Sequence, residues 1–287
     1  MITKCIIPVA GFGTRFLPVT KAQPKEMLPI VDKPILQFLV EEAVASGIKD
    51  IIFVTGRGKG SIEDHFDCSF ELEYNLVEKG KQQLLKEVRR ISELANFFYV
   101  RQPRPLGDGH AILCAKEFVG NEPVAVLFGD DIVDAKTPCL KQLMNVFEKY
   151  NNSVIALERI PKKDVSRFGV VGAIELDKRT YEIKKFVEKP PVEKAPSNLS
   201  FVGKIILTPD FFEILEKHPN ASGEIRLADA FIEGLKQNKP LYGYEFEGRR
   251  YDCGSKLGFL EATVDFALKH PEVSSDFRKY LEKKISK

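Results

Sequence analysis

A glycine turn crowded with basic side chains is the segment of this chain best suited to chemistry. Gly11 and Gly13 follow the first apolar run and allow backbone amides to approach a phosphate closely. Three cations come after them: Arg15, Lys21 and Lys25. Together they suit a triphosphate and the negative charge that develops during phosphoryl transfer, although a tight turn with solvated cations would have the same sequence.

This turn matches neither of the two common nucleotide-binding motifs. A dinucleotide-binding fingerprint would need a third glycine where Phe16 stands, and a P-loop would need Gly-Lys-Ser or Gly-Lys-Thr, which occurs nowhere in the chain. The sequence therefore favours a phosphate-binding loop of another kind.

Carboxylates follow two later segments of the chain. Asp130 and Asp131 end the apolar run 124–128, and Asp252 follows Arg249-Arg250-Tyr251. Magnesium normally uses one or two protein carboxylates together with substrate phosphates, so one acid of the pair is enough if another arrives from elsewhere. The alternative is that these acids merely terminate strands and turns.

A third group, Glu188-Lys189, stands before a proline-containing loop. Such a Glu can accept hydrogen bonds from sugar hydroxyls while the Lys meets a sugar phosphate. A solvated ion pair is the simpler interpretation of these two residues taken alone.

The histidines do not favour hydrolysis by a catalytic triad. None of the four lies near a serine or cysteine in a known nucleophile motif, and we interpret His65 and His110 as hydrogen-bonded structural groups. A phosphate nucleophile is already anionic at neutral pH and needs no base, so positioning, cations and a metal can supply catalysis.

The elements that must position these residues alternate between strand and helix. Strands are expected at 3–9, 51–54, 97–100, 124–128, 153–157, 170–174, 185–188 and 201–207, with helical segments near 36–43, 72–94, 109–116, 137–147 and 257–268. This pattern predicts an α/β fold with a mainly parallel sheet covered on both faces and ligands beyond the carboxyl ends of the strands. No low-complexity linker divides the chain, so we expect a single domain, 1–287, with a nucleotide-binding half at 1–150 and a second-substrate half with C-terminal helices at 151–287.

Composition excludes several classes of protein. The 287 residues are 44% hydrophobic and 29% charged, which is typical of a soluble globular protein and not of disorder or collagen. The net charge of +2 disfavours a nucleic-acid or membrane partner, and no apolar run approaches the ~20 residues of a membrane helix. Five scattered cysteines without a CxxC pair favour reduced thiols and a cytoplasmic location.

Taken in order, these segments resemble those of the bacterial UTP–glucose-1-phosphate uridylyltransferases, also called UDP-glucose pyrophosphorylases. The resemblance covers nearly the whole chain and is most specific in the Pro-Lys-Glu-Met segment and the Tyr-Asp-Cys-Gly segment. It runs through Gly11–Arg15, Pro24–Pro34, Val54–Arg57, Glu63–Asp67, Val100–Gln102, Gly129–Asp131, Val187–Pro190, Ala195–Asn198 and Arg250–Gly254.

The resemblance implies a fold and a reaction. The fold would be a Rossmann-like three-layer α/β/α nucleotidyltransferase. Glucose 1-phosphate would attack the α-phosphorus of UTP, giving UDP-glucose and pyrophosphate with Mg²⁺ as cofactor. The family commonly forms homodimers or homotetramers.

The resemblance also assigns roles to residues at matching positions. Uridine would be held by Ala10, Gly11, Glu26, Gln102 and Gly107, with Gly13 in the same nucleotide-binding turn. Arg15, Lys25 and Lys189 would be catalytic, the first two facing the UTP phosphates. Asp130 and Asp252 would hold Mg²⁺, with Asp131 the weaker candidate. Glucose 1-phosphate would be surrounded by Gly169, Glu188, Lys189 and Gly203.

The chain departs from the family pattern at three places. Asp108 stands where Leu is usual, Arg226-Leu227-Ala228-Asp229 replaces Gln-Leu-Thr-Asp, and Phe168 replaces Tyr. Asp108 puts the base preference and the role of its loop in doubt. Two alternatives therefore remain: thymidylyl or other nucleotidyl transfer to a sugar 1-phosphate, and a non-catalytic sugar-nucleotide sensor with the same fold.

Overall fold

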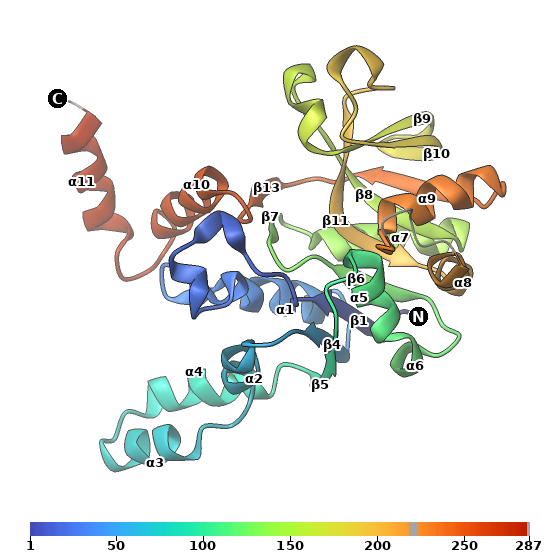
Figure 1. Ribbon diagram of the computed structural model, residues 1–287. Helices are drawn as coiled ribbons and strands as arrows, with labels where there is room; N and C mark the ends of the chain where they lie inside the picture. Colours follow the sequence, from blue (N-terminus) through green and yellow to red (C-terminus); the bar gives the residue numbers. More distant parts are fainter. Residues whose placement is uncertain (218–222, 286–287) are drawn as a thin grey trace.

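A nine-stranded sheet runs through both halves of the computed structural model, which describes residues 1–217 and 223–285 (Figure 1). Its strands, in spatial order, are β5 (Asn96–Arg101), β4 (Asp50–Thr55), β1 (Lys4–Pro8), β6 (Val124–Leu127), β11 (Leu199–Leu207), β8 (Ser153–Arg159), β12 (Leu241–Glu245), β10 (Thr180–Glu188) and β9 (Gly169–Asp177). Two short pairs stand apart from it, β2 (Pro29–Ile30) with β3 (Lys33–Pro34) and β7 (Asp131–Asp134) with β13 (Arg249–Asp252).

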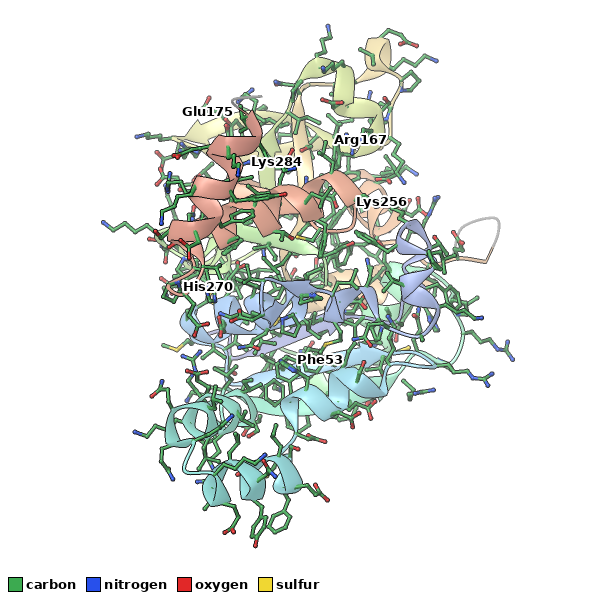
Figure 2. All side chains as sticks on the ribbon, turned by 90° about the vertical axis from the view of Figure 1, so that its left-hand side faces the viewer. Phe53, Arg167, Glu175, Lys256, His270 and Lys284 are labelled. Atoms are coloured by element: carbon green, nitrogen blue, oxygen red, sulfur yellow. The ribbon has the colours of Figure 1, made fainter. Side chains whose placement is uncertain are left out.

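Helices cover both faces of this sheet. The described helices are α1 (Ile35–Ala45), α2 (Gly60–Phe66), α3 (Phe70–Glu78), α4 (Gln82–Ser92), α5 (Asp108–Cys114), α6 (Lys116–Val119), α7 (Cys139–Tyr150), α8 (Pro209–Lys217), α9 (Leu227–Lys236), α10 (Lys256–Ala267) and α11 (Ser274–Ile285). Helix α11 extends away from the sheet (Figure 1) and has no buried residue. Short 3₁₀ helices occur at Thr14–Phe16, Val19–Lys21, Lys25–Met27, Lys162–Arg167 and Val192–Lys194. Figure 2 shows α10 and α11, which carry Lys256 and Lys284, on the side of the molecule that is on the left in Figure 1.

The two faces of the sheet bury alternate residues of the same strands. In β6, Ala125 and Leu127 pack with α1, α2 and α7, whereas Val124 and Val126 pack with α5, α8 and α9. A strand buried on both faces is continuously apolar, which makes 124–128 recognisable in the sequence. The predicted three-layer α/β/α fold is confirmed.

The direction of the strands differs between the halves. Strands β5, β4, β1 and β6 are parallel, as predicted, but β11 is antiparallel to both of its main neighbours, and β9 and β10 form an antiparallel pair. Only two residues, Lys178 and Arg179, connect β9 to β10. A parallel pair would need a crossover of a dozen or more residues, so this connection dictates the antiparallel arrangement.

Other boundaries also depart from the sequence prediction. The helical segment 72–94 is divided into α3 and α4 at Gly80, whose φ of 66° interrupts the helix. Strands β7, β12 and β13 and helices α8 and α9 were not predicted. The two short strands matter most, because the β7–β13 register pairs Asp131 with Asp252 and so joins residues from opposite halves of the chain.

The carboxyl ends of the parallel strands place the predicted site residues on one edge of the sheet. Ala10 and Gly11 follow β1, Gln102 follows β5, and Asp130 follows β6. Ligands of open α/β sheets bind at this edge, so the strand order alone gathers these residues.

A buried ion pair fixes the helical layer behind this edge. The Lys204 side chain is fully buried, and its Nζ lies 2.6 Å from Glu42 Oε2. The other carboxylate oxygen of Glu42 accepts the amide of Leu140, 3.0 Å away, at the start of α7. One carboxylate therefore connects β11, α1 and α7 in the core.

We predict that Lys204→Met lowers the free energy of unfolding by about 3–5 kcal/mol, because it leaves the Glu42 carboxylate buried without its counter-charge. The double variant Lys204→Met/Glu42→Gln should recover most of this loss, since the neutral side-chain amide still offers an oxygen that accepts the Leu140 N–H. Urea denaturation measures both values. Lys149→Met, in the exposed pair with Asp177, is the control and should have a much smaller effect. A single Lys204 variant as stable as the wild type would contradict the prediction.

Candidate active site

One cavity of about 430 Å³ lies over the carboxyl ends of the parallel strands. It is lined by Pro8, Ala10, Gly11, Phe12, Lys25, Glu26, Gln102, Pro105, Gly107, Asp108, Ala111, Phe128, Gly129, Asp130 and Glu224. Five residues predicted to hold the nucleoside therefore line the same cavity as Lys25 and Asp130.

Gly13 shapes the loop beside this cavity without lining it. Its φ is 64°, and its carbonyl accepts the Thr20 hydroxyl at 2.8 Å and the Phe16 amide at 3.0 Å. A Cβ atom at Gly13 would lie only 3.0 Å from Lys25 Cβ. The glycine thus permits both the turn and the close approach of Lys25.

Lys25 and Asp130 form the ion pair at the end of β6. The Lys25 Nζ lies 2.6 Å from Asp130 Oδ2. Burial opposes ionisation of Asp130, but the attraction and hydrogen bond of the Lys25 ammonium, together with Arg15 and Arg250, outweigh it, so the pKa of Asp130 is lowered. Asp130 is therefore a carboxylate at neutral pH and is available to a cation.

Asp252 reaches the same place from the other end of the chain. A Cβ atom built on Gly254 would lie 3.1 Å from Asp252 Oδ1 and even closer to Asp130 Oδ2, so both oxygens lie beside Gly254, whose amide donates to Asp252 Oδ1 at 3.1 Å. Burial and the nearby Asp131 carboxylate raise the pKa of Asp252. Arg15 donates to the Gly254 carbonyl at 3.2 Å and so brings its guanidinium to these acids.

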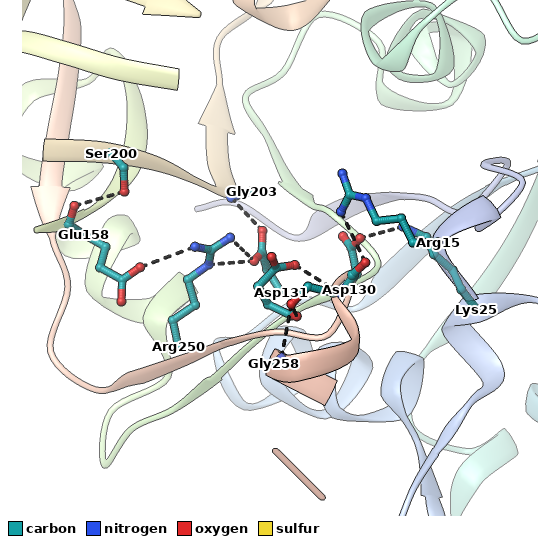
Figure 3. Close-up of polar contacts among 12 residues, drawn as sticks. Arg15, Lys25, Asp130, Asp131, Glu158, Ser200, Gly203, Arg250 and Gly258 are labelled. Atoms are coloured by element: carbon teal, nitrogen blue, oxygen red, sulfur yellow. Dashed lines mark hydrogen bonds and ion pairs between the residues drawn. The ribbon is translucent and has the colours of Figure 1, made fainter. Parts of the chain in front are cut away.

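Asp131 has a different role from its neighbour. The guanidinium of Arg250 donates through Nε to Asp131 Oδ1 at 2.7 Å, and Asp131 Oδ2 accepts the Gly203 amide at 3.1 Å (Figure 3). Arg250 also contacts Glu158 Oε2 at 3.4 Å and covers the Phe168 ring at 5.2 Å from its centroid. Figure 3 shows the contacts of Arg250 with Asp131 and Glu158 on one side of Asp130, with Arg15 and Lys25 on the other. Asp131 thus joins β7, β11 and β13.

A second cavity, of about 690 Å³, adjoins the first. It contains the residues predicted for the sugar phosphate together with Arg15 and both predicted metal ligands: Gly169, Glu188, Lys189, Gly203, Arg15, Asp130 and Asp252. Asp108, Phe128 and Asp130 line both cavities, so the two spaces meet at these residues.

Two glycines keep the second cavity open. A Cβ atom at Gly203 would lie 2.7 Å from Phe128 Cβ, and one at Gly169 would lie 3.0 Å from Glu188 Oε2. Lys189 has a φ of 45°, and its exposed Nζ lies 3.5 Å from Glu188 Oε1. Its ammonium is therefore free to reach a ligand in the cavity.

Glu26 is less available to a ligand than the sequence suggested. Its carboxylate is 1% exposed and lies 2.9 Å from Nζ of Lys59, which is 6% exposed. Burial raises the pKa of Glu26, and Lys59 opposes that shift. Glu26 lines the nucleotide cavity, but Lys59 is its charge partner. Sequence reasoning missed Lys59 because lysines are common on surfaces and nothing local marks this one as buried.

Asp108, the unusual acid of the glycine loop, joins two helices. Its Oδ1 accepts the amides of Gly109 at 2.8 Å and Leu227 at 3.0 Å, so it connects the start of α5 to the start of α9. Burial raises its pKa. No contact with the base side of the cavity follows from these bonds.

The sequence also missed the Asp131–Arg250–Glu158 connection. The sequence does contain two pairs of adjacent like charges, Asp130-Asp131 and Arg249-Arg250. Because adjacent residues of a strand point to opposite faces, the two members of each pair are expected to have different contacts. Only the β7–β13 pairing shows which member of each doublet faces the site.

The arrangement is suited to phosphoryl transfer. The carboxylates of Asp130 and Asp252 both lie beside Gly254, and the cations near them are Arg15, Lys25 and Arg250. The two cavities meet beside Asp130. Within residues 1–217 and 223–285, no cluster of three or more His, Cys, Asp or Glu side chains forms a complete metal site. Two carboxylates completed by phosphate oxygens match the coordination that Mg²⁺ prefers.

Known proteins with similar sequences cover the full length of the chain. It is 53% identical over 282 residues to the UTP–glucose-1-phosphate uridylyltransferase of Staphylococcus haemolyticus, covering 98% of both chains. It is 50% identical over 287 residues to that of Bacillus subtilis, covering 100% of this chain and 98% of the relative.

Solved structures of similar fold carry related descriptions. A UDP-glucose pyrophosphorylase complexed with UDP-glucose matches with a TM-score of 0.86 and 46% identity, covering 94% of this chain and 100% of the other. A UTP-bound enzyme from Acinetobacter baumannii matches with a TM-score of 0.91 and 40% identity, covering 98% and 99%. A putative glucose-1-phosphate thymidylyltransferase from Bacillus anthracis, at 23% identity and a TM-score of 0.72, shares the fold.

The family model for nucleotidyl transferases matches residues 4–268, which include both cavities. Together with the identities above, this match shows that the chain belongs to the nucleotidyl transferase family and, within it, to the UTP–glucose-1-phosphate uridylyltransferases.

Proposed function

We propose that this chain transfers the uridylyl group of UTP to glucose 1-phosphate, giving UDP-glucose and pyrophosphate. The observation that carries the proposal is the meeting of the two cavities at Asp130, because both substrates must touch the same phosphorus. A phosphate oxygen of glucose 1-phosphate forms the new bond to the α-phosphorus of UTP. The bond between this phosphorus and the oxygen that bridges it to the β-phosphorus breaks. The pyrophosphate leaves with that electron pair, and no proton need move.

The basic residues stabilise charge during this exchange. Lys25 and Arg15 stand beside Asp130 and face the UTP phosphates, where negative charge moves onto the leaving pyrophosphate. Lys189 faces the phosphate of the sugar, and Glu188 accepts hydrogen bonds from its hydroxyls. Ala10, Gly11, Gln102 and Gly107 enclose the base at the far end of the first cavity.

Asp130 and Asp252 are the residues that would hold Mg²⁺. Oxygens of both lie beside Gly254, where the Cβ of a side chain on residue 254 would collide with Asp130 Oδ2 and crowd Asp252 Oδ1. The bound ion would neutralise phosphate charge and polarise the α-phosphoryl group. Asp131 remains outside this pair, since both of its oxygens are engaged by Arg250 and Gly203.

The comparisons favour uridylyl transfer over the alternatives. The one thymidylyltransferase named above is too distant in sequence to indicate more than a shared fold. A sensor would not need the transfer machinery, yet Arg15, Lys25, Asp130, Lys189 and Asp252 line the two cavities together.

We further propose that the chain assembles as a homodimer or homotetramer in the cytoplasm. Helix α11 has no buried residue and carries an apolar stripe of Phe277, Tyr280, Leu281 and Ile285. Association would cover this stripe. The five free thiols are those of a reducing compartment, and the described residues contain no helix able to cross a bilayer.

Purified protein should release pyrophosphate from UTP only when glucose 1-phosphate and Mg²⁺ are present. Asp130→Asn should lower kcat about 100-fold or more, because it removes a charge at the reacting phosphate. Asp177→Asn, a change in an exposed pair remote from the cavities, is the control and should keep wild-type activity. Equal rates from wild type and the Asp130 variant would remove Asp130 from the catalytic site, whereas a wild type that binds UTP but releases no pyrophosphate would support the sensor.

Lys189→Ala should raise the KM for glucose 1-phosphate about tenfold or more and change that for UTP by less than about threefold, because one charge-assisted contact to the sugar phosphate is lost. Initial rates at varied concentrations of each substrate measure both constants. Lys194→Ala, on the neighbouring 3₁₀ helix, should alter neither. An unchanged KM for glucose 1-phosphate in the Lys189 variant would remove this residue from the sugar-phosphate site.

A further inference from the structure

A histidine stands directly behind the base end of the nucleotide cavity. His110 lies in the first turn of α5, and its backbone amide donates to the Ile225 carbonyl at 3.1 Å. Its ring Nδ1 lies 3.1 Å from Nε2 of Gln102. Gln102 lines the cavity but His110 does not, so the ring contacts the amide from outside the ligand space.

The Gln102 amide has only one orientation that satisfies its neighbours. Its Nε2 donates to the Gly107 carbonyl at 2.9 Å and directs its other hydrogen to His110 Nδ1. A flipped amide would set Oε1 against the Gly107 carbonyl, which is an acceptor facing an acceptor. The backbone also holds Gln102 in place, because the backbone N–H of Gln102 donates to the Thr55 carbonyl at 2.8 Å.

This orientation leaves Oε1 as the free polar atom of the side chain. Among the described residues, nothing donates a hydrogen bond to it, while both amide hydrogens are taken by the protein. The cavity therefore presents an acceptor at its base end. Uracil carries an N–H donor at N3, whereas cytosine carries an acceptor at the same position.

We propose that His110 is a positioning residue that fixes the Gln102 amide with Oε1 toward the base, and so makes the site select UTP over CTP. This inference rests on the proposed function, because it assigns a determinant of its nucleotide specificity. In a site built to accept a hydrogen bond, an analogue without the matching donor leaves polar atoms unpaired and is rejected.

The environment keeps the His110 ring in the form that this role requires. Burial lowers its pKa, so the neutral ring predominates at neutral pH. Because Nδ1 accepts from Gln102, the ring proton is on Nε2. The Cys114 thiol, one turn later and 4.0 Å from Nδ1, is a weak donor and is compatible with an acceptor there.

The test compares kcat/KM for UTP with kcat/KM for CTP in three variants of the full chain. His110→Ala and His110→Leu both remove one of the two acceptors that orient the amide and leave the Gly107 carbonyl as the other, so the preference for one orientation weakens and the UTP/CTP ratio should fall about tenfold or more. His110→Asn offers Oδ1 near the place of Nδ1 and should keep the ratio within about threefold of wild type. The kcat with saturating UTP and the KM for glucose 1-phosphate should change little in all three.

A second histidine–glutamine pair supplies a matched control. His65 Nε2 lies 3.0 Å from Gln37 Oε1, outside both cavities, so His65→Leu should leave the ratio unchanged. A wild-type ratio in a folded His110→Ala or His110→Leu overturns the proposal, as does a loss of kcat at an unchanged ratio, which would mark a merely structural role. Absence of pyrophosphate release from wild type with UTP would instead refute the proposed function.

Discussion

Electrostatic repulsion among three acids is the constraint around which this site is built. Asp130, Asp131 and Asp252 lie together on one sheet edge, where the first two raise the cost of ionising Asp252. The protein offsets this repulsion with a separate cation for two of them: Lys25 pairs with Asp130 and Arg250 with Asp131. Asp252 has no such close cation in the described part of the chain, and its pKa is raised. An approaching cation therefore gains most where Asp130 and Asp252 face each other.

The same constraint explains why adjacent aspartates have different roles. Asp131 begins β7, and its backbone pairing to Asp252 brings the two halves of the chain together. Its side chain then joins Arg250 to the Gly203 amide, and all three residues line the second cavity. Replacing Asp131 would therefore disturb the position of Asp252 as well as the charge. A structural acid beside the proposed ligand Asp130 would fix the geometry of a metal site from outside its ligand set.

The sequence predicted those parts of the molecule that depend on local pattern. The apolar run 124–128 and the loop after β1 follow from residue type and spacing, and the carboxyl-edge rule then places Ala10, Gln102 and Asp130 together. What could not be predicted depends on distant pairing. Lys59 is buried only because η3 (Lys25–Met27) brings Glu26 against it, and Arg250 meets Asp131 only through the β7–β13 pair. The pairing of Asp252 with Asp130 as ligands of one Mg²⁺ ion came from the family resemblance, because no local pattern indicates which acids meet.

The two ends of the nucleotide cavity recognise their ligand by different physical means. At its proposed phosphate end, Lys25 and Asp130, with Arg15 and Asp252 in the adjoining cavity, would act through net charge, which is strong but tolerates many geometries. At the base end, Gln102 is neutral, so selectivity there depends on which atom of one amide faces the ligand. The two amide orientations carry the same net charge and differ only in where the donor and acceptor atoms point, so hydrogen-bond partners distinguish them. Here these partners are two neutral acceptors, the Gly107 carbonyl and the His110 ring. Affinity and base selection are therefore physically separable within a single cavity.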